Sequence, residues 1–343
     1  MVSAHGPAPG RIAGWKAVGI SVIIATYNRA ALLDECLDHL RRQRFEPGDE
    51  VIVVDNGSTD DTSAVIGRHQ RLSAVPLRHL EERAAGKSRA LARALAVASG
   101  DILAFTDDDV DVEEGWLGAI RTAMVDPGVA LIGGPVDPRW ERGAPPWLPV
   151  TRDGYGRLAS PLALLDYGPR PADLGARTVV GANFAVRRDV AARVGGFAPH
   201  LGKLRGTLLS GEDHDFCRRV QAAGFRTAYC PDARVRHWVP ANRVRLRYFL
   251  SWFFWSGVTN AALEENDPPP ARSIFGLPLY LVRRFAVGLI AAPAAALAGR
   301  TATALDHAMD VAFAAGYAAK RWGLVRLNRA APAQPRRTVG GII

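Results

Sequence analysis

The 343-residue sequence has only three cysteines, Cys36, Cys217 and Cys230, and they lie far apart. An odd and scattered set forms neither a disulfide framework nor a zinc pattern, so we expect a reducing compartment. The sequence also lacks a G-x-G-x-x-G fingerprint after its first apolar run and has no G-x-x-x-x-G-K-[ST] motif. Dinucleotide-dependent redox chemistry and P-loop hydrolysis therefore lose their main sequence support.

Most of the chain is close to neutral, and its excess positive charge is concentrated near the C-terminal end. The net charge is +9, and residues 268–343 alone carry +8. A uniformly basic body would indicate nucleic acid, whereas a basic, Ala- and Leu-rich tail favours an anionic membrane surface. Residues 1–18 contain Gly, Pro and Ala without a continuous apolar run. We interpret them as a flexible tail and not as a signal peptide.

Apolar runs of strand length alternate with helical stripes through the first 125 residues. The predicted strands are residues 20–25, 51–54, 75–80 and 102–105. The predicted helices are marked by an apolar stripe of Leu33, Cys36, Leu37 and Leu40, by Val65 and Ile66, and by the Ala- and Leu-rich residues 86–99, closed by Gly100. This alternation predicts an α/β fold with a mainly parallel sheet covered on both faces.

The run D-I-L-A-F-T-D-D-D-V-D, residues 101–111, places three carboxylates directly after a buried strand. Asp107, Asp108 and Asp109 repel one another, so they tolerate this crowding best with water or a cation nearby. Hard cations such as Mg²⁺ prefer oxygen ligands, and ligands of open α/β sheets collect at the carboxyl ends of strands. The run therefore predicts a cation site, with a solvated acidic turn as the alternative.

Polar and aromatic side chains also follow the neighbouring predicted strands. In Thr26-Tyr27-Asn28-Arg29, Tyr27 would stack on a planar base, and Asp55 at the next strand end would accept a hydrogen bond from a base N–H. Arg83 and Lys87 would neutralise phosphate charge. Taken singly, these residues also suit packing, an ordinary turn or a helix-face cation. Their placement at successive strand ends favours a nucleotide site.

Five segments in the same order make residues 21–239 resemble the family 2 glycosyltransferases of the GT-A fold. They are S-V-I-I-A-T-Y-N-R, V-I-V-V-D-N-G-S-T-D-D-T, G-K-S-R-A-L-A-R-A-L, F-T-D-D-D-V and G-E-D-H-D-F. The resemblance implies a Rossmann-like sheet flanked by helices, a nucleotide-diphosphate-sugar donor, most often a UDP-sugar, and transfer with inversion. It also implies that Asp107 meets the ribose and that Asp109 binds Mg²⁺ or Mn²⁺, with Asp108 as the middle residue of the D-x-D motif.

Residues 179–186 are a further predicted strand, in which Gly181 and Ala182 would let a ligand approach the backbone. The segment Gly-Ala-Asn-Phe is similar to the family's segment that lines the donor sugar, which implies a hydrogen bond from Asn183 to a sugar hydroxyl. With it, the predicted nucleotide-sugar site comprises Thr26, Tyr27, Asn28, Arg29, Asp55, Arg83, Lys87, Asp107, Asp108 and Asn183.

The segment G-E-D-H-D-F, residues 211–216, opens a predicted helix with carboxylates in its first turn. Glu212 and Asp213 suit the positive end of the helix dipole, so capping is one interpretation. The other makes Asp213 the general base that deprotonates the acceptor hydroxyl, with Glu212 positioning it or the acceptor. The E-D motif of the family favours this second assignment, and Asp215 is a weaker candidate.

Two further sets of residues each have two interpretations. His237 is either a structural histidine or, as the resemblance implies, an additional ligand of the metal held by Asp107 and Asp109. Trp140 and Trp147, on a stretch rich in Pro and Gly, are either platforms for a sugar ring or staples that hold a long loop to the body.

Residues 285–299 are an uncharged stretch between Arg283-Arg284 and Arg300, interrupted by Pro293. A single span needs about twenty apolar residues, so we interpret this stretch as interfacial or re-entrant, or else as part of a helical pair packed on the catalytic body. The processive synthases related to the family carry Q-x-x-R-W and several clear spans. Here Ala318 precedes Arg321-Trp322, which favours a single-addition enzyme.

The sequence thus predicts a tail (1–18), a catalytic domain (19–262) and a basic helical extension (263–343) that favours membrane association. Within the domain, residues 19–125 would bind the nucleotide and residues 126–262 would supply the acceptor and catalytic groups. The predicted activity is metal-dependent sugar transfer to a glycan or lipid-linked acceptor, for cell-envelope or extracellular glycan synthesis, in the cytoplasm or at the cytoplasmic membrane face. A nucleotidyltransferase and a non-catalytic, membrane-bound nucleotide-sugar scaffold are the alternatives.

Overall fold

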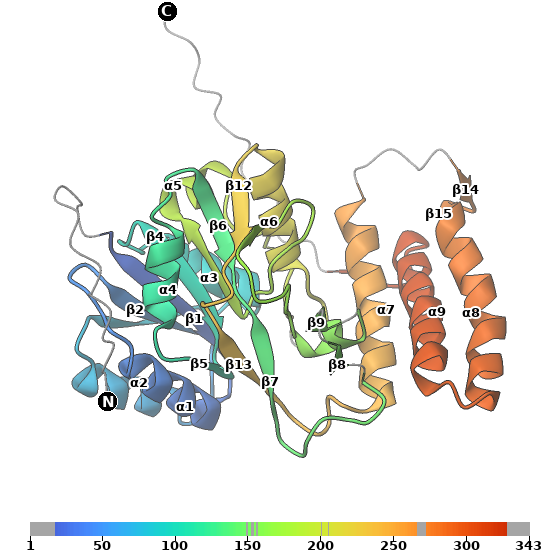
Figure 1. Cartoon of the computed structure of the whole chain (residues 1–343), viewed down its shortest axis with the longest axis horizontal. Helices are drawn as coiled ribbons and strands as arrows, with labels where there is room; N and C mark the ends of the chain where they lie inside the picture. Colours follow the sequence, from blue (N-terminus) through green and yellow to red (C-terminus); the bar gives the residue numbers. More distant parts are fainter. Residues whose placement is uncertain are drawn as a thin grey trace, which may run out of the picture.

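The computed structural model describes residues 18–148, 150–151, 154–155, 157–199, 201–204, 206–265 and 272–327. Nearly all of the predicted N-terminal tail and the end of the extension, residues 328–343, lie outside the described residues. The described chain forms an α/β body and, beside it, three long C-terminal helices (Figure 1).

The body is built on an eight-stranded sheet with the strand order β10-β12-β6-β11-β4-β1-β2-β3. Strands β4, β1, β2 and β3 run parallel, β12 is parallel to β6, and β11 is antiparallel to both of its neighbours. The four strands predicted in the first 105 residues are confirmed. The bounds are β1 (Ile20–Thr26), β2 (Glu50–Asp55), β3 (Leu77–Glu81), β4 (Ile102–Asp107), β6 (Val129–Gly133), β10 (Ala172–Asp173), β11 (Asn183–Arg187) and β12 (Arg226–Tyr229).

Helices cover both faces of this sheet, because the central strands are apolar on both sides. Along β1, successive side chains alternate between the two faces: Val22 and Ile24 belong to one buried cluster, and Ile23 belongs to the other. The predicted stripe of the first helix is buried, as expected. The first cluster is covered by α1 (Ala30–Arg41), α2 (Thr62–Leu72) and α4 (Trp116–Ala123), and the second by α3 (Lys87–Leu95), α5 (Arg188–Arg193) and α6 (Glu212–Ala222).

A second sheet of three strands brings a distant segment to the end of β4. Its order is β5-β13-β7, with β5 (Val110–Val112) directly after the aspartate run, β13 (Val235–Val239) and β7 (Val136–Trp140). His237 on β13 pairs in register with Val110 on β5. This pairing places His237 beside the aspartate run, although the two lie far apart in the sequence.

Two predicted boundaries are wrong. The third helix ends at Leu95 and not at Ser99. The N–H of Ser99 donates to Glu50 at 2.7 Å and that of Gly100 donates to the Ser21 hydroxyl at 2.9 Å, so neither continues the helix. The strand predicted over residues 179–186 begins only at Asn183. The N–H of Gly181, which precedes it, donates to a carboxylate of α6 at 2.5 Å and does not join the sheet.

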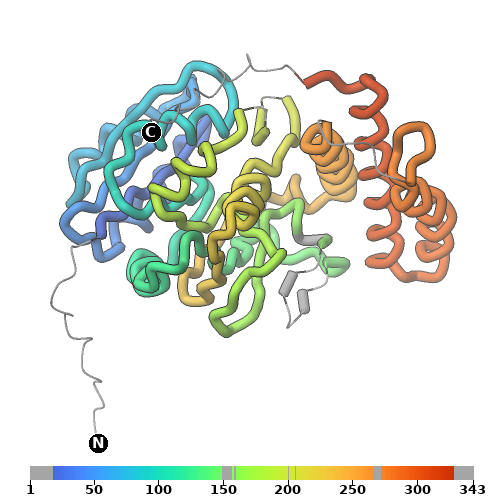
Figure 2. The backbone as a smooth tube through the Cα atoms, turned by 90° about the horizontal axis from the view of Figure 1, so that it is seen from above, coloured from blue at the N-terminus to red at the C-terminus, as the bar shows by residue number. Residues whose placement is uncertain are grey.

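The C-terminal helical unit consists of α7 (Leu246–Leu263), α8 (Leu279–Leu297) and α9 (Thr301–Arg321), with a short hairpin of β14 (Ser273–Ile274) and β15 (Leu277–Pro278) before α8. α9 lies between α7 and α8, and α7 faces the body (Figure 1, Figure 2). The backbones of α7 and α9 approach closely at two glycines. A Cβ atom at Gly257 would lie 2.0 Å from the carbonyl oxygen of Phe313, and one at Gly316 would lie 1.9 Å from that of Phe254.

α7 joins this unit to the body. Phe249 and Phe253 are buried in a cluster with body residues that include Leu162, at the end of the 3₁₀ helix η1 (Arg157–Leu162). Trp140 and Trp147 pack on the same cluster, and the rings of Trp147 and Phe249 meet edge to face at 4.9 Å. This packing favours the interpretation of the two tryptophans as staples. The short strands β8 (Val150–Thr151) and β9 (Gly154–Tyr155) lie in the same loop region.

Within the described residues, α8 is the one helix that is long and apolar enough, by length and composition, to cross a membrane. It has 19 residues, more than the predicted uncharged stretch, because it starts at Leu279 and continues through Pro293. Only Leu281 and Gly288 are buried along it. The extension is therefore helical, and its outermost helix is a candidate for membrane association.

Candidate active site

The carboxyl ends of three adjacent parallel strands form the rim of the site. Thr26 at the end of β1 pairs in register with Asp55 at the end of β2, and Ala25 pairs with Asp107 at the end of β4. The sheet thus brings together three of the loops that the sequence singled out, as expected for the ligand-binding edge of an open α/β sheet.

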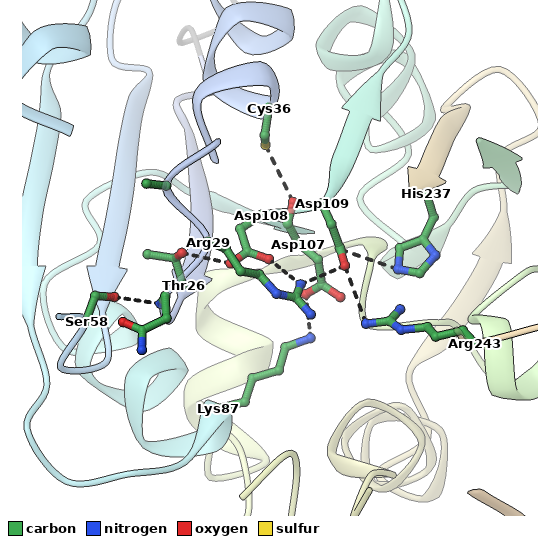
Figure 3. A network of polar contacts seen from close by, with 12 residues as sticks. Thr26, Arg29, Cys36, Ser58, Lys87, Asp107, Asp108, Asp109, His237 and Arg243 are labelled. Atoms are coloured by element: carbon green, nitrogen blue, oxygen red, sulfur yellow. Dashed lines mark hydrogen bonds and ion pairs between the residues drawn. The ribbon is translucent and has the colours of Figure 1, made fainter. Parts of the chain in front are cut away.

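The three adjacent aspartates are held in a network of hydrogen bonds and ion pairs (Figure 3). Thr26 Oγ1 donates to Asp108 at 2.7 Å, and Arg29 Nη1 donates to Asp108 at 2.8 Å and to Asp109 at 2.7 Å. Lys87 Nζ donates to Asp107 Oδ1 at 2.5 Å. Asp108 and Asp109 are buried, so the alternative of a solvated acidic turn is wrong.

Of the three adjacent aspartates, Asp109 is the one with a buried oxygen that accepts no hydrogen bond from the described residues. Burial disfavours its charge, but the nearby His237, Arg29 and Arg243 hold the pKa of Asp109 well below its usual range. Its Oδ1 atom is buried and has no hydrogen-bond partner among the described residues, with His237 Nε2 at 3.4 Å. An ionised, desolvated oxygen without a partner is costly, so this atom is suited to receive a ligand.

The described residues contain no group of three or more His, Cys, Asp or Glu side chains arranged to hold a metal ion. His237 Nε2 nevertheless lies 3.4 Å from Asp109 Oδ1, and both residues are drawn with Asp107 in the network of Figure 3. Mg²⁺ and similar cations are often bound by one or two carboxylates plus substrate phosphates. The residues fit a cation of that kind better than one in a closed protein cage.

Two cavities meet at this network. The first, about 370 Å³, is lined by Tyr27, Arg29, Asn56, Gly86 and Asp108 among others. The second, about 290 Å³, is lined by residues from the segment before β11, from α6 and from α7. Lys87, Asp107 and Lys203 line both. The shared wall therefore carries one carboxylate and two amino groups.

The loop between β3 and α3 is fixed by an asparagine that the sequence reasoning missed as a site residue. Asn56 Oδ1 accepts from the N–H of Gly86 at 2.9 Å, and its amide donates to the carbonyl groups of Glu82 and Ala84. Gly86 has a φ of 137°, which side chains rarely allow. Asn56 belongs to the V-D-N-G-S segment, which could have indicated it as a site residue.

Glu212 and Asp213 both line the second cavity but differ in their environment. Asp213 accepts from the N–H of Gly181 at 2.5 Å and from the backbone N–H and ring Nδ1 of His214 at 2.8 and 2.9 Å. Burial disfavours its charge, but His214 and Lys87 hold the pKa of Asp213 far below its usual range. Burial and the charge of Asp213 raise the pKa of Glu212. Asp213 thus accepts from a first-turn N–H of α6, as a capping residue does, and in addition it bonds across to another loop.

Five of the predicted site residues line neither cavity: Asn28, Asp55, Arg83, Asp109 and Asn183. Arg83 is almost fully exposed and lies 3.8 Å from Glu81. Asn183 is buried, and its amide donates to the carbonyl groups of Pro135 and Ala233 while its oxygen accepts from Trp116 Nε1. Its bonding groups are thus used within the fold, which departs from the expected contact with a sugar hydroxyl.

Asn28 and Asp55 shape the rim without lining either cavity. Asn28 has a φ of 51° and accepts from the N–H of Thr59 at 2.7 Å. Asp55 accepts from the N–H of Ser58 at 2.8 Å, and Ser58 Oγ accepts in turn from the N–H of Asn28. These bonds tie the loops after β1 and β2 to each other. Asp215, the weaker candidate on α6, accepts from Arg219 at 2.9 Å.

The second cavity also contains groups that the sequence reasoning did not assign. Arg243 Nη2 lies 3.7 Å from Asp109 Oδ2, and Tyr248 and Trp252 on α7 line the same cavity as Glu212. The alternation of arginines and aromatics over residues 243–255 could have indicated Arg243, Tyr248 and Trp252 as site residues. Lys203 lies in a loop that carries no comparable pattern.

Comparisons with known proteins agree on the family. The family model "Glycosyl transferase family 2" matches residues 21–195. A glucosyl-dolichyl phosphate glucuronosyltransferase of Haloferax volcanii is 26% identical, over 73% of this chain and 78% of that protein. A pre-mycofactocin glycosyltransferase of Mycobacterium tuberculosis is 31% identical over 73% of this chain, but the match spans only 48% of that longer protein.

The fold is shared with a solved enzyme. A mannosyltransferase from Pyrobaculum calidifontis in complex with GDP-Man and Mn²⁺ superposes with a TM-score of 0.61 and 23% identity, over 89% of this chain and 87% of that one. The mainly parallel sheet with flanking helices is therefore a GT-A fold, as predicted. Together with the family match over half of the sequence, these findings show that the chain belongs to the family 2 glycosyltransferases.

Proposed function

We propose that the protein is a metal-dependent, inverting transferase that moves a sugar from a nucleotide diphosphate to an acceptor hydroxyl, in cell-envelope or extracellular glycan synthesis. The observation that carries the proposal is the pair of cavities joined at Lys87 and Asp107, with Glu212 and Asp213 on the second one. A donor spanning the shared wall would have its nucleotide in the first cavity and its sugar in the second, beside two carboxylates.

On the donor side, Tyr27 stacks on the base at the rim of the first cavity, and Asp107 accepts from the ribose. Thr26 and Arg29 hold Asp108, which keeps the aspartate run in place. Lys87, Arg29 and Arg243 face the diphosphate, where fixed positive charge stabilises the leaving group as its negative charge grows. Arg243 supports this role because it is nearly buried and turned toward Asp109.

Asp109 and Asp107, with His237, would hold a divalent cation, Mn²⁺ or Mg²⁺. The unpartnered oxygen of Asp109 supports this assignment, as does the Mn²⁺ in the complex of the mannosyltransferase of similar fold. When bound, the cation supplies charge neutralisation at the diphosphate.

On the acceptor side, Asp213 takes the proton from the attacking hydroxyl, and the acceptor oxygen displaces the diphosphate from the opposite face of the anomeric carbon. This single displacement inverts the configuration. The bonds from Gly181 and His214 fix the carboxylate of Asp213, and Glu212 positions the acceptor. Tyr248 and Trp252 provide aromatic faces for a sugar ring.

The resemblance favours a UDP-sugar, whereas the mannosyltransferase of similar fold was solved with GDP-Man, so both nucleotides belong in the test. A glycan or lipid-linked acceptor is supported by the relative named for a glucosyl-dolichyl phosphate and by the apolar helix α8. We place the enzyme in the cytoplasm, peripherally on the cytoplasmic face of the membrane.

The test combines calorimetry with UDP, GDP and dTDP, with and without Mn²⁺, and product analysis with Asp109→Ala and Asp213→Asn. Both variants should lose transfer, and Asp109→Ala should also lose the effect of Mn²⁺ on nucleotide binding. Asp215→Asn is the matched control, since that carboxylate is bonded to Arg219 and lines neither cavity. Release of pyrophosphate would indicate a nucleotidyltransferase, and nucleotide-sugar binding without any product would indicate a scaffold.

A further inference from the structure

Apart from Arg283 and Arg284, the outward side of α8 is apolar. Leu279, Ile290 and Leu297 are 42%, 74% and 92% exposed. They are spaced by about three turns and about two turns, so they lie on one stripe. Val287 and Leu289, beside this stripe, are also about half exposed. These five residues define the α8 outer face.

A helix on the surface of a soluble protein presents polar residues on its outward side. α8 presents none between Arg284 and Arg300. It packs inward on α9, where Gly288 allows close approach to Val311 and the carbonyl of His307. In both views α8 is the outermost helix, with α9, α7 and then the body behind it (Figure 1, Figure 2). The α8 outer face is therefore directed away from the catalytic body.

Positive charge flanks the apolar stretch at both ends. Arg283 and Arg300 are exposed, and neither forms an ion pair within the described part of the chain, whereas Arg284 is paired with Asp310. The uncharged residues 285–299 span about 22 Å at the rise of an α-helix, less than the roughly 30 Å of a hydrocarbon core. Basic ends on a short apolar helix suit a position along an anionic lipid surface.

Aromatic side chains at the start of α8 extend the same surface. Phe275, in the turn between β14 and β15, is 87% exposed, and Trp322 Nε1 donates to its carbonyl oxygen at 3.1 Å. Tyr280 and Trp322 are each 55% exposed. Tyrosine and tryptophan are enriched where apolar and polar regions of a membrane meet.

We propose that the α8 outer face docks the enzyme on an anionic lipid surface, with α8 lying along the membrane plane and Arg283 and Arg300 among the headgroups. The apolar stripe enters the acyl boundary, and Phe275 enters beside it. The proposal deepens the peripheral membrane association stated above and is independent of the transferase chemistry.

The experiment is flotation of the full chain with vesicles of phosphatidylcholine alone or mixed with phosphatidylglycerol. The protein should float with the mixed vesicles and bind the neutral ones more weakly. Ile290→Asp should reduce binding at least about tenfold, because it places a charge in the apolar stripe. Arg283→Gln and Arg300→Gln should each reduce binding to the mixed vesicles roughly fivefold and leave binding to neutral vesicles unchanged.

Leu72→Asp is the matched control, since Leu72 is 52% exposed on α2 of the body; it should float as the wild type does. Leu297→Asp, at the exposed end of α8, carries the test if Ile290→Asp fails to fold. Nucleotide binding by calorimetry without vesicles should be the same for all variants, so loss of docking is separable from failure of the proposed activity.

Four results would overturn the proposal. The first is that the wild type fails to float with the mixed vesicles. The second is that Ile290→Asp and Leu297→Asp both float as well as the wild type does. The third is that alkaline carbonate fails to release the protein from the vesicles, which would mean that α8 spans the bilayer. The fourth result is that the protein does not bind vesicles but forms a dimer in the absence of lipid, and that Ile290→Asp makes this dimer monomeric. That result would assign the α8 outer face to a second copy of the chain.

Discussion

Lys87 and Asp107 form an ion pair, with Nζ 2.5 Å from Oδ1, in the wall that separates the two cavities. The same ammonium group lies 3.7 Å from Oε1 of Glu212. Burial disfavours the charge of Lys87, but Asp107 and Glu212 raise its pKa above the usual value. One cation thus connects the end of β4 with the first turn of α6.

Lys87→Met should destabilise the fold, because it leaves the partly buried Asp107 and the buried Glu212 without their counter-charge. Removing one partner of a buried pair costs about 3 kcal/mol, which urea denaturation at neutral pH would measure. Lys87→Arg should retain much of the stability. An unchanged free energy of unfolding in Lys87→Met would show that the carboxylates do not depend on this cation.

Glu212 should make stability fall as pH rises above 4.5, its ordinary pKa. Burial and Asp213 raise the pKa of Glu212 in the folded protein, so the folded state holds this proton more tightly than the unfolded chain does. Raising the pH therefore favours the unfolded chain through this group. In Glu212→Gln this contribution is absent, and unfolding free energies measured from pH 4.5 to pH 7.5 should fall less than in the wild type. Parallel curves would contradict the assignment.

His214 should set the acid limb of the activity profile. It is the largest influence that lowers the pKa of Asp213 against the effect of burial. His214→Ala removes it, so the pKa of Asp213 rises and kcat/KM should begin to fall at a higher pH than in the wild type. Profiles of kcat/KM against pH for both proteins measure the shift. A uniform loss of rate without a shift would mean that His214 acts only on the structure.

Arg243 should discriminate nucleoside diphosphates from monophosphates. Its guanidinium faces Asp109 in the second cavity, beside the shared wall that the donor is proposed to span. A hydrogen bond to a charged group contributes about 1.5–3 kcal/mol, so Arg243→Ala should weaken nucleoside diphosphate binding at least about tenfold and change monophosphate binding little. Calorimetry with both ligands tests this, and equal losses for the two would contradict it.

Gly257→Ala should destabilise the packing of α7 on α9. The added methyl group would lie 2.0 Å from the carbonyl oxygen of Phe313, so the helices must separate, at a cost of about 1–3 kcal/mol. Gly118→Ala on α4 is the control, because nothing lies within 4 Å of its added Cβ and alanine favours a helix by up to about 1 kcal/mol. Thermal unfolding of the two variants should shift in opposite directions.

The parts of the fold that depend on local patterns were predictable. The strands β1, β2 and β4 follow from continuous apolar runs of strand length, and the stripe of α1 follows from its helical periodicity. The aspartate run was placed at a strand end for the same reason. The resemblance to the family 2 glycosyltransferases then indicated which of these motifs belong to one site, because a parallel sheet brings the ends of its strands to one edge.

The remaining parts depend on contacts between distant segments. Arg243 reaches Asp109 only because β13 pairs with β5, and the spacing of residues does not encode that pairing. Asn183 has the residue type expected of a sugar ligand, yet its amide nitrogen donates to Pro135 and Ala233 and its amide oxygen accepts from Trp116 on α4. Arg83 follows a strand end as predicted, but its side chain extends into solvent.

The position of α7 has a consequence for acceptor choice. One side of this helix carries Tyr248 and Trp252 in the catalytic cavity, and close to its middle Gly257 receives the backbone of α9. Removal of the three C-terminal helices would therefore remove one wall of the catalytic cavity. The proposed reaction would then be open to bulk water, which would favour hydrolysis of the donor. Evolution can retune which acceptors fit by altering the helices behind α7, without changing a single carboxylate.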